Sequence, residues 1–198
     1  MRYADSHKAG SRSRILKAAA QQLRARGLHK VSVADVMSDA GLTHGAFYAH
    51  FGSKDALVAG AVPEMFGDAG DRAGGIAELS VHAGEDLRAA LRTFLESYLS
   101  ASHRDRPDRG CPLPTLAADI SRADARIRDN FIVGLNRMTG RIADALSRLP
   151  RTYPDTDARI LVAQIVGAVS LARALGPGAP SDAILRDCLD ASIERLGL

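Results

Sequence analysis

The sequence contains no tryptophan and few aromatic residues of any kind. Aromatic side chains make up 5% of its 198 residues, whereas alanine and leucine are abundant. Strands favour aromatic and β-branched residues, and helices favour alanine and leucine. With 46% hydrophobic residues the chain can still bury a packed core. We therefore expect an all-α protein, with a length that suits one domain or two small ones.

Cysteines and long apolar runs are also scarce. Two cysteines, Cys111 and Cys188, are too few for a disulfide framework or a zinc site. The most apolar stretch covers only residues 160–172, short of the roughly 20 residues that cross a bilayer. The N-terminal segment has no apolar stretch that would mark it for secretion. We expect a cytoplasmic protein with no metal, no cofactor and no membrane partner.

Positive charge is concentrated near the N-terminus. The first 66 residues carry nine Lys and Arg against five Asp and Glu, whereas the remaining residues carry 17 against 18. All four lysines lie within the first 54 positions. A basic head on a near-neutral body is typical of a protein that binds a polyanion. A solvated basic face without a partner would explain the charge equally well.

Three helical segments are predicted within this basic head. Residues 12–26 place apolar side chains at helical spacing, and Gly27 predicts a Schellman-type end. A second helix begins at Ser32, in a capping-box pattern, and ends nine residues later at Gly41. A third segment follows over residues 43–51. Two short helices joined at a glycine-containing turn form a helix-turn-helix pattern.

The outward face of the third segment favours DNA as the partner. It offers no acid and consists of Thr43, His44, Gly45, Ala46, Tyr48 and His50. A glycine in a solvated helix costs roughly 1 kcal/mol relative to alanine, which is easier to explain if a large partner approaches the backbone. The DNA major groove admits such a helix. Lys54 then opens a fourth helix whose N–H groups would bind phosphate. Alternatively, Tyr48 and His50 merely cover the core of a helical subdomain.

The run from Ser32 to Leu57 resembles the signature of the TetR/AcrR family of bacterial transcriptional regulators. The resemblance covers about residues 11–60 and includes the turn, the aromatic pair around Tyr48 and the Phe-x-Ser-Lys-x-x-Leu exit in register. It implies a helix-turn-helix DNA-binding domain over residues 1–60 and a helical ligand-binding and dimerisation domain over residues 61–198. It also implies a homodimeric repressor that binds a palindromic operator in double-stranded DNA and is released by a small-molecule effector.

The same resemblance assigns individual residues to the DNA. Phosphate contacts are implied for Ser32, Thr43, Tyr48, His50 and Lys54. Base-facing positions are implied for His44, Gly45 and Ala46. Neither Arg nor Asn occupies the base-facing positions, so bidentate base recognition is not available there. Specificity would then depend on Thr43, His44, DNA shape or the basic arm before Ser11.

The body is predicted to be a bundle of longer helices. Irregular chain is expected from Pro63 through the glycine-rich residues 67–84, and again over residues 104–114. An apolar cavity between the helices would take a modestly sized apolar or aromatic effector. Its candidate lining residues, most of which would serve equally well as plain core, are Leu91, Phe94, Leu95, Tyr98, Leu113, Leu116, Phe131, Leu135, Met138, Ile165 and Val169.

The last two predicted helices differ from the others in their apolar character. The helix over residues 156–175 is apolar on nearly every side and needs cover on more than one of them. Burial within one chain is one solution, and a four-helix bundle with a second copy is the one we favour. Ser181 is predicted to cap the final helix. The candidate interface residues are Ile160, Val162, Val166, Gly167, Val169, Leu185, Leu189 and Ile193.

Three alternatives to a ligand-released repressor were weighed. Cys111 lies near several cations in sequence, and cations lower the pKa of a thiol. The first alternative is therefore a repressor that senses oxidants or electrophiles through Cys111. A buried, inert cysteine is the plainer interpretation. An enzyme is disfavoured because His103 and Cys111 form the only close base and nucleophile, with no acid to orient the imidazole. A helical adaptor that binds no DNA is the third alternative.

Overall fold

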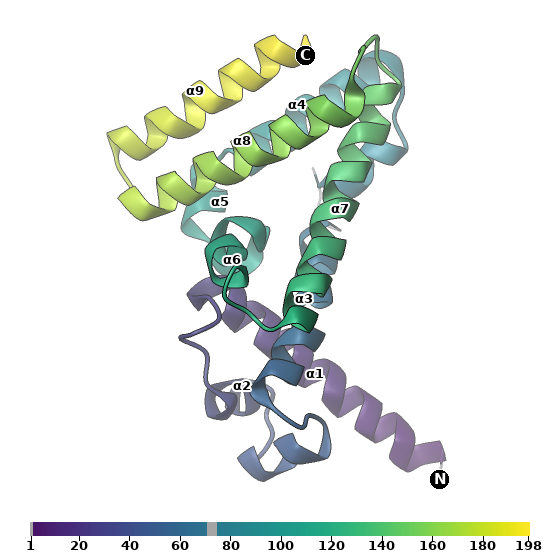
Figure 1. Ribbon diagram of the computed structural model, residues 1–198, viewed down its shortest axis with the longest axis vertical. Coiled ribbons are helices and arrows are strands. Elements are labelled where there is room, and N and C mark those ends of the chain that lie inside the picture. Colours follow the sequence, from purple (N-terminus) through teal and green to yellow (C-terminus); the bar gives the residue numbers. More distant parts are fainter. Residues whose placement is uncertain (1, 71–74) are drawn as a thin grey trace.

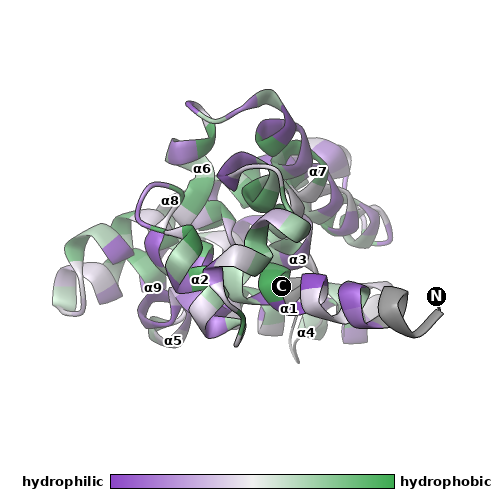
Figure 2. Cartoon of the chain, turned by 90° about the horizontal axis from the view of Figure 1, so that it is seen from below, coloured by the Kyte–Doolittle hydropathy of each residue, from purple (hydrophilic) through white to green (hydrophobic). Residues whose placement is uncertain are grey.

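The computed structural model describes residues 2–70 and 75–198, and the regular elements in these residues are all helices, as expected (Figure 1). In chain order they are α1 (Arg2–Arg26), α2 (Val33–Asp39), η1 (His44–Ala49), α3 (Lys54–Gly70), η2 (Ile76–Ser80), α4 (Gly84–Tyr98), α5 (Ala101–Asp105), η3 (Pro107–Arg109), α6 (Leu113–Ile120), α7 (Ala125–Ser147), α8 (Pro154–Leu175) and α9 (Ala179–Leu196), where η denotes a 3-10 helix. The head elements lie at one end of the molecule, and α8 and α9 lie side by side at the other. The N-terminal part of α1 projects away from the other helices (Figures 1 and 2).

Local contacts explain the arrangement of the head. The Ser32 hydroxyl caps α2 by accepting a hydrogen bond from the Asp35 N–H at 3.0 Å. The buried rings of Phe47 and Phe51 stack on the inner side of η1, with their centroids 5.8 Å apart. Arg12 of α1 donates to the His50 carbonyl at 2.9 Å and lies 4.3 Å from the centroid of the Phe51 ring. These contacts fix the inner side of η1, so its outer side is presented in a defined orientation.

Several boundaries differ from those predicted. α1 begins at Arg2, well before residue 12, and the third segment is a 3-10 helix, the form that short helical pieces often take. α3 continues through Pro63 to Gly70, where irregular chain was predicted. Pro63 is exposed, while Val62 and Met65 on either side are fully buried, so the packing of its neighbours outweighs the hydrogen bond that the proline removes. Of the predicted glycine-rich loop, residues 71–74 lie outside the described part of the chain, and residues 76–80 form η2.

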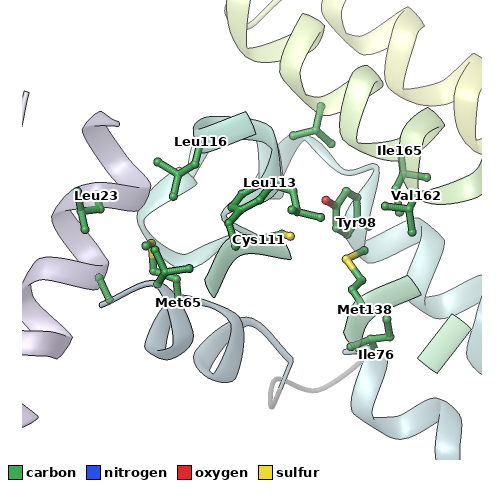
Figure 3. Close-up of a cluster of buried hydrophobic side chains, with 14 of the residues drawn as sticks. Leu23, Met65, Ile76, Tyr98, Cys111, Leu113, Leu116, Met138, Val162 and Ile165 are labelled. Carbon is green, nitrogen blue, oxygen red and sulfur yellow. The ribbon is translucent and has the colours of Figure 1, made fainter. Parts of the chain in front are cut away.

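Head and body share one hydrophobic core. Leu23 of α1 and Met65 of α3 lie at one side of a cluster that continues through Leu116 of α6 to Ile165 of α8 (Figure 3). All four side chains are fully buried, and each contributes roughly 1.5–3 kcal/mol relative to an exposed position. The domain boundary predicted between residues 60 and 61 falls inside the continuous helix α3. The two-domain division therefore stays a prediction, and motion of the body can reach the head through packed side chains.

Polar contacts reinforce the junction between α1 and the body. Gly27 ends α1 with φ at +79°, and its N–H donates to the Leu23 carbonyl at 2.9 Å. The next N–H, of Leu28, does not close the predicted Schellman motif but donates to Oδ2 of Asp119 in α6 at 2.9 Å. One turn earlier, the buried Arg24 side chain donates to the Asp108 carbonyl at 2.8 Å and the Met65 carbonyl at 3.2 Å. The end of α1 is thus bonded to η3, α3 and α6.

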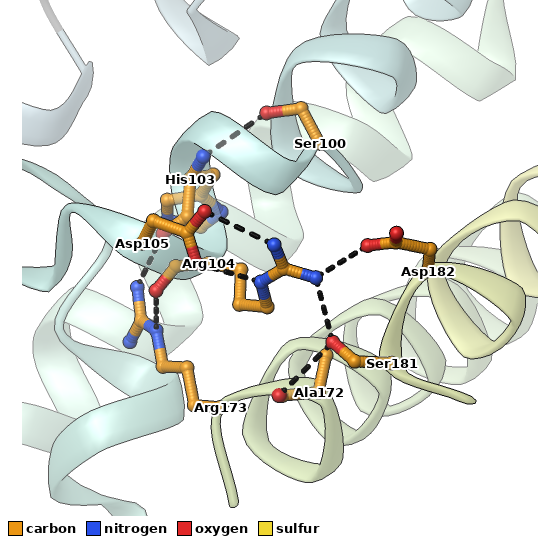
Figure 4. A network of polar contacts seen from close by, with 8 residues as sticks. All are labelled: Ser100, His103, Arg104, Asp105, Ala172, Arg173, Ser181 and Asp182. Atoms are coloured by element: carbon orange, nitrogen blue, oxygen red, sulfur yellow. Dashed lines mark hydrogen bonds and ion pairs between the residues drawn. The ribbon is translucent and has the colours of Figure 1, made fainter. Parts of the chain in front are cut away.

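A buried arginine joins α5 to α9. Arg104 donates to the Ser181 hydroxyl at 2.7 Å and contacts Asp105 at 2.7 Å and Asp182 at 2.5 Å (Figure 4). The hydrogen bonds to Asp105 and then Asp182 raise the pKa of Arg104 above its ordinary value. Ser181 lies inside α9 and donates to the Ala172 carbonyl at 3.2 Å. The prediction that Ser181 caps the last helix is therefore wrong, because its hydroxyl is used between helices.

Helix α8 is long and apolar enough to cross a membrane, judged by length and composition only. The sequence prediction counted a shorter apolar run, whereas the helix itself begins at Pro154. Leu161, Ile165 and Val169 are fully buried, and α8 packs against α7 and α9. A core helix of a soluble protein meets the same criterion, and the burial of this face agrees with such a role.

Candidate DNA-binding surface and body cavity

The predicted DNA-contacting residues lie in or next to three consecutive helices of the head. Ser32 precedes α2, Lys54 begins α3, and the others belong to η1 or flank it. The exposed members are Ser32, Thr43, His44, Gly45 and Tyr48, and the half-buried members are Ala46, His50 and Lys54. The Tyr48 side chain is 70% exposed, although its ring makes an edge contact with Phe47 at a centroid distance of 5.2 Å. Such an exposed but supported aromatic ring is available to a partner.

Gly45 is not required by the fold. A Cβ built at Gly45 would have no atom within 4 Å, and the residue has no positive φ. The protein itself would therefore accept a larger side chain at this position. The absence of a side chain therefore affects only a partner molecule that contacts the outer side of η1, such as DNA with η1 in its major groove.

The flanks of this surface suit phosphate. The Ser53 hydroxyl accepts the Ala56 N–H at 3.1 Å and caps α3, whose first-turn N–H groups lack carbonyl partners within the helix. Lys54, the first residue of α3, adds a positive charge at this terminus. Burial, with smaller contributions from Lys8 and Arg12, lowers the pKa of His50 below its ordinary value, so the free protein holds this imidazole neutral at pH 7.

A cavity of about 400 Å³ lies in the body, bordered by the end of α3 and by η2, α4, α5, η3 and α7. Three of the predicted lining residues, Phe94, Tyr98 and Met138, do line it, and so does Cys111. The other eight predicted residues are not among the lining and pack in or against the core: Leu91, Leu95, Leu113, Leu116, Phe131, Leu135, Ile165 and Val169.

Sequence reasoning missed the charged part of the cavity. Arg106, Arg109 and Arg137, which are exposed, and the half-buried Arg141 line it. Helical spacing contained a signal for two of them, because Arg137 and Arg141 recur with Gly134 and Met138 at intervals of three and four residues on α7.

Cys111 and His103 have structural contacts in the cavity wall. Nδ1 of His103 lies 2.7 Å from the Tyr98 carbonyl and must donate to it, while Nε2 accepts the Cys111 N–H at 3.1 Å. The imidazole is therefore held as the neutral tautomer. Burial raises the pKa of the Cys111 thiol, and its side chain is 9% exposed. Both features disfavour a reactive thiolate. Among the described residues no group of three or more His, Cys, Asp or Glu could hold a metal.

The predicted dimer-interface residues divide into two sets. Val162, Val169 and Leu185 are buried within the chain itself, where they serve the core between α8 and its neighbours. Ile160 is exposed, whereas Val166, Gly167, Leu189 and Ile193 are half-buried. Leu171 and Leu175, which the sequence prediction did not include, are 59% and 58% exposed on α8.

A helix-turn-helix head on a helical body is the architecture of a DNA-binding transcriptional regulator. Two family models match the chain: "Bacterial regulatory proteins, tetR family" over residues 15–61 and "Tetracyclin repressor-like, C-terminal domain" over residues 88–187. The second match alone covers half of the chain, and the protein belongs to the TetR family of bacterial transcriptional regulators. This is a family of regulators, not of enzymes, which confirms the expectation that the chain is no enzyme.

Individual relatives agree with this assignment. The chain is 45% identical over 49 residues to YdgC and 29% identical over 98 residues to YvdT, two uncharacterised HTH-type transcriptional regulators of Bacillus subtilis (strain 168). These matches span 25% and 48% of both the chain and the relative. The chain thus matches at most about half the length of these curated relatives.

Solved structures share the fold over nearly the whole chain. The reduced form of Escherichia coli NemR superposes with a TM-score of 0.76 at 19% identity, covering 93% of this chain and 95% of that one. A TetR-family regulator from Agrobacterium tumefaciens gives 0.74 at 23% identity, covering 93% and 98%. At these identities the likeness shows the all-helical fold alone.

Proposed function

We propose that the protein is a cytoplasmic, ligand-responsive repressor that binds a palindromic operator in double-stranded DNA as a homodimer. The observation that carries the proposal is the outer side of η1, where an open Gly45 lies beside a 70% exposed Tyr48 and no acid is present. A groove-reading helix needs a surface that is slim and free of negative charge. The basic head supplies the electrostatic attraction to phosphates.

Dimerisation would proceed through α8 and α9. Ile160, Leu171 and Leu175 expose 48%, 59% and 58% of their surfaces on α8, and large apolar side chains gathered on one helix favour cover by a partner. A second copy would complete a four-helix bundle and present two heads to half-sites spaced about one turn of DNA, roughly 34 Å, apart. A palindromic operator follows from the twofold symmetry of such a dimer.

Release by an effector would use the cavity. Its wall includes η3, whose Asp108 carbonyl is bonded to Arg24 of α1, so a change in the wall reaches the helix that packs against the whole head. An effector must bind the DNA-incompetent arrangement more tightly than the competent one, because equal affinity for both would shift nothing.

Selection of bound sequences from a random duplex DNA pool tests the DNA-binding proposal. We expect one palindromic motif for the wild type and for Gly140→Gln, a control substitution on the exposed side of α7 where a Cβ also meets no atom within 4 Å. Gly45→Gln should keep the fold but lose the motif, and Tyr48→Ala and Lys54→Ala should weaken it. Equal behaviour of the wild type and all variants at low salt, with nothing enriched, would overturn the proposal.

A further inference from the structure

The cavity in the body carries an excess of positive charge. Arg106 and Arg109 contribute from the chain around η3, and Arg137 and Arg141 contribute from successive turns of α7. No carboxylate is among the lining residues that the structure describes. Arg106, Arg109 and Arg137 are exposed where the cavity meets solvent, and Arg141 is half-buried deeper in its wall. Like charges one turn apart on a helix repel each other, so an anion bound between Arg137 and Arg141 would relieve this repulsion.

Three of these arginine side chains are unpaired among the described residues, which distinguishes them from the other arginines in that part of the chain. The other structurally placed arginines, such as Arg24 and Arg173, donate to backbone carbonyls. The side chains of Arg106, Arg137 and Arg141 make no hydrogen bond or ion pair with the residues whose side chains the structure describes. Guanidinium groups that the fold does not use, gathered around one cavity, are available for a carboxylate, which they can bind in a bidentate manner.

The rest of the lining combines an apolar wall with polar side chains, namely Ser97, Ser100, Ser102, His103 and the buried Tyr98. Phe66, Phe94 and Met138 supply the apolar wall, and the Phe66 ring lies so close to Gly134 that a Cβ there would overlap it. Tyr98 is more than nine-tenths buried, and its hydroxyl has no hydrogen-bond partner of good geometry among the described residues. Figure 3 shows this hydroxyl next to the Cys111 sulfur at the cavity wall. The Cys111 thiol is a weak hydrogen-bond partner, so a polar group of a bound molecule would satisfy this buried hydroxyl better.

We infer that the cavity binds an organic acid: an amphipathic molecule whose carboxylate pairs with Arg137, Arg141 and Arg106, and whose aromatic or alkyl part packs on Phe66, Phe94 and Met138. The volume of about 400 Å³ is within the range of small-molecule sites. The inference rests on the proposed ligand-responsive function and deepens it. It also revises the expected effector, because a wholly apolar molecule would cover the half-buried Arg141 without pairing its charge.

Calorimetric titration of the full-length protein tests this inference with matched probes. Phenylacetate, 4-phenylbutyrate and decanoate would each be compared with the corresponding primary amide, which keeps the shape and removes the charge. We expect the acids to bind, the amides to bind at least tenfold more weakly, and the acid affinity to fall at high salt. Arg141→Met and Arg137→Met should each weaken acid binding at least tenfold. Arg128→Met, an exposed arginine on the same helix outside the cavity lining, should not.

The ligand-free variants give an independent measurement. Because Arg137 and Arg141 have no partners to lose, Arg141→Met should leave the melting temperature unchanged or raise it, whereas a structural arginine would lower it. Amides that bind as tightly as the acids, acids that bind equally well to Arg141→Met and Arg128→Met, or a panel in which no acid binds would each overturn the inference. Acid binding in a protein that selects no operator would refute the proposed function and leave the organic-acid site supported.

Discussion

Replacing Arg24 with methionine should weaken the junction between head and body. The residue is 4% exposed, and its guanidinium donates to two backbone carbonyls, of Asp108 in η3 and Met65 in α3. Methionine keeps the apolar stem and most of the packing, so the substitution isolates the hydrogen bonds. Both carbonyls would be left without this donor in a buried place.

The expected loss follows from these two bonds. A hydrogen bond from a charged donor is worth about 1.5–3 kcal/mol, so removing two of them costs about 3–6 kcal/mol of unfolding free energy. In a chain of this length each kcal/mol lowers the melting temperature by about 2–4 °C, which gives a decrease on the order of 10 °C. Effector binding should also change the operator affinity of Arg24→Met less than that of the wild type, because the cavity wall loses its bond to α1.

Urea unfolding at fixed protein concentration measures the first effect, since the stability of a dimer depends on protomer concentration. Arg14→Met is the matched control, because Arg14 is exposed on the same helix and its hydrogen bond, to Ser11 at 3.4 Å, is long. We expect the control to stay within about 0.5 kcal/mol of the wild type. Equal stabilities of Arg24→Met and Arg14→Met would refute the assignment of Arg24 as the link.

Three further predictions concern single sites. Gly134→Ala should lower the melting temperature in calorimetry, at a cost of about 1–3 kcal/mol, because its methyl group would overlap the Phe66 ring. Gly140→Ala, with open space around the added methyl group, should be neutral or stabilising. Equal effects of the two substitutions would contradict the packing argument. Operator affinity should rise as the pH falls from about 7.5 to 6, because His50 takes up a proton beside the phosphates, whereas its lowered pKa keeps it neutral in the free protein. His50→Tyr should flatten this dependence of affinity on pH. A wild type with the same pH dependence as the variant would exclude the mechanism. Iodoacetamide should alkylate Cys111 negligibly in the folded protein and readily in denaturant, because burial raises the pKa of this thiol; rapid labelling of the native protein would restore the oxidant-sensing alternative.

The head could be predicted from the sequence because its determinants are local. The Ser32 cap acts over three residues, and the pair of Phe47 and Phe51 is spaced by one helical turn, so both features can be recognised without knowledge of distant contacts. The outward side chains of η1 follow once the inward ones are known. Family resemblance added the assignment of phosphate- and base-facing positions, which remains a prediction.

The body was harder to predict because its determinants lie far apart in the chain. Ser181 looked like a helix cap, yet its hydroxyl accepts a hydrogen bond from Arg104, 77 residues earlier. α3 passes through Pro63 because Val62 and Met65 are buried in a core shared with the other helices. The cavity was predicted as apolar since arginines are usually solvated, and only the folded chain shows that Arg137 and Arg141 line a cavity without partners.

The end of α1 limits how this regulator could be recombined with others. A chimera joined at residue 60 would cut α3 in its middle and separate Arg24 and Leu28 from Asp108 and Asp119, their acceptors in the body. To exchange DNA specificity, a donor head would therefore need an arginine at the position of Arg24 and a free N–H at the position of Leu28. Otherwise the exchanged segment would have to include η3 and α6 as well. The unit that can be transplanted with its regulation intact is larger than the unit that reads DNA.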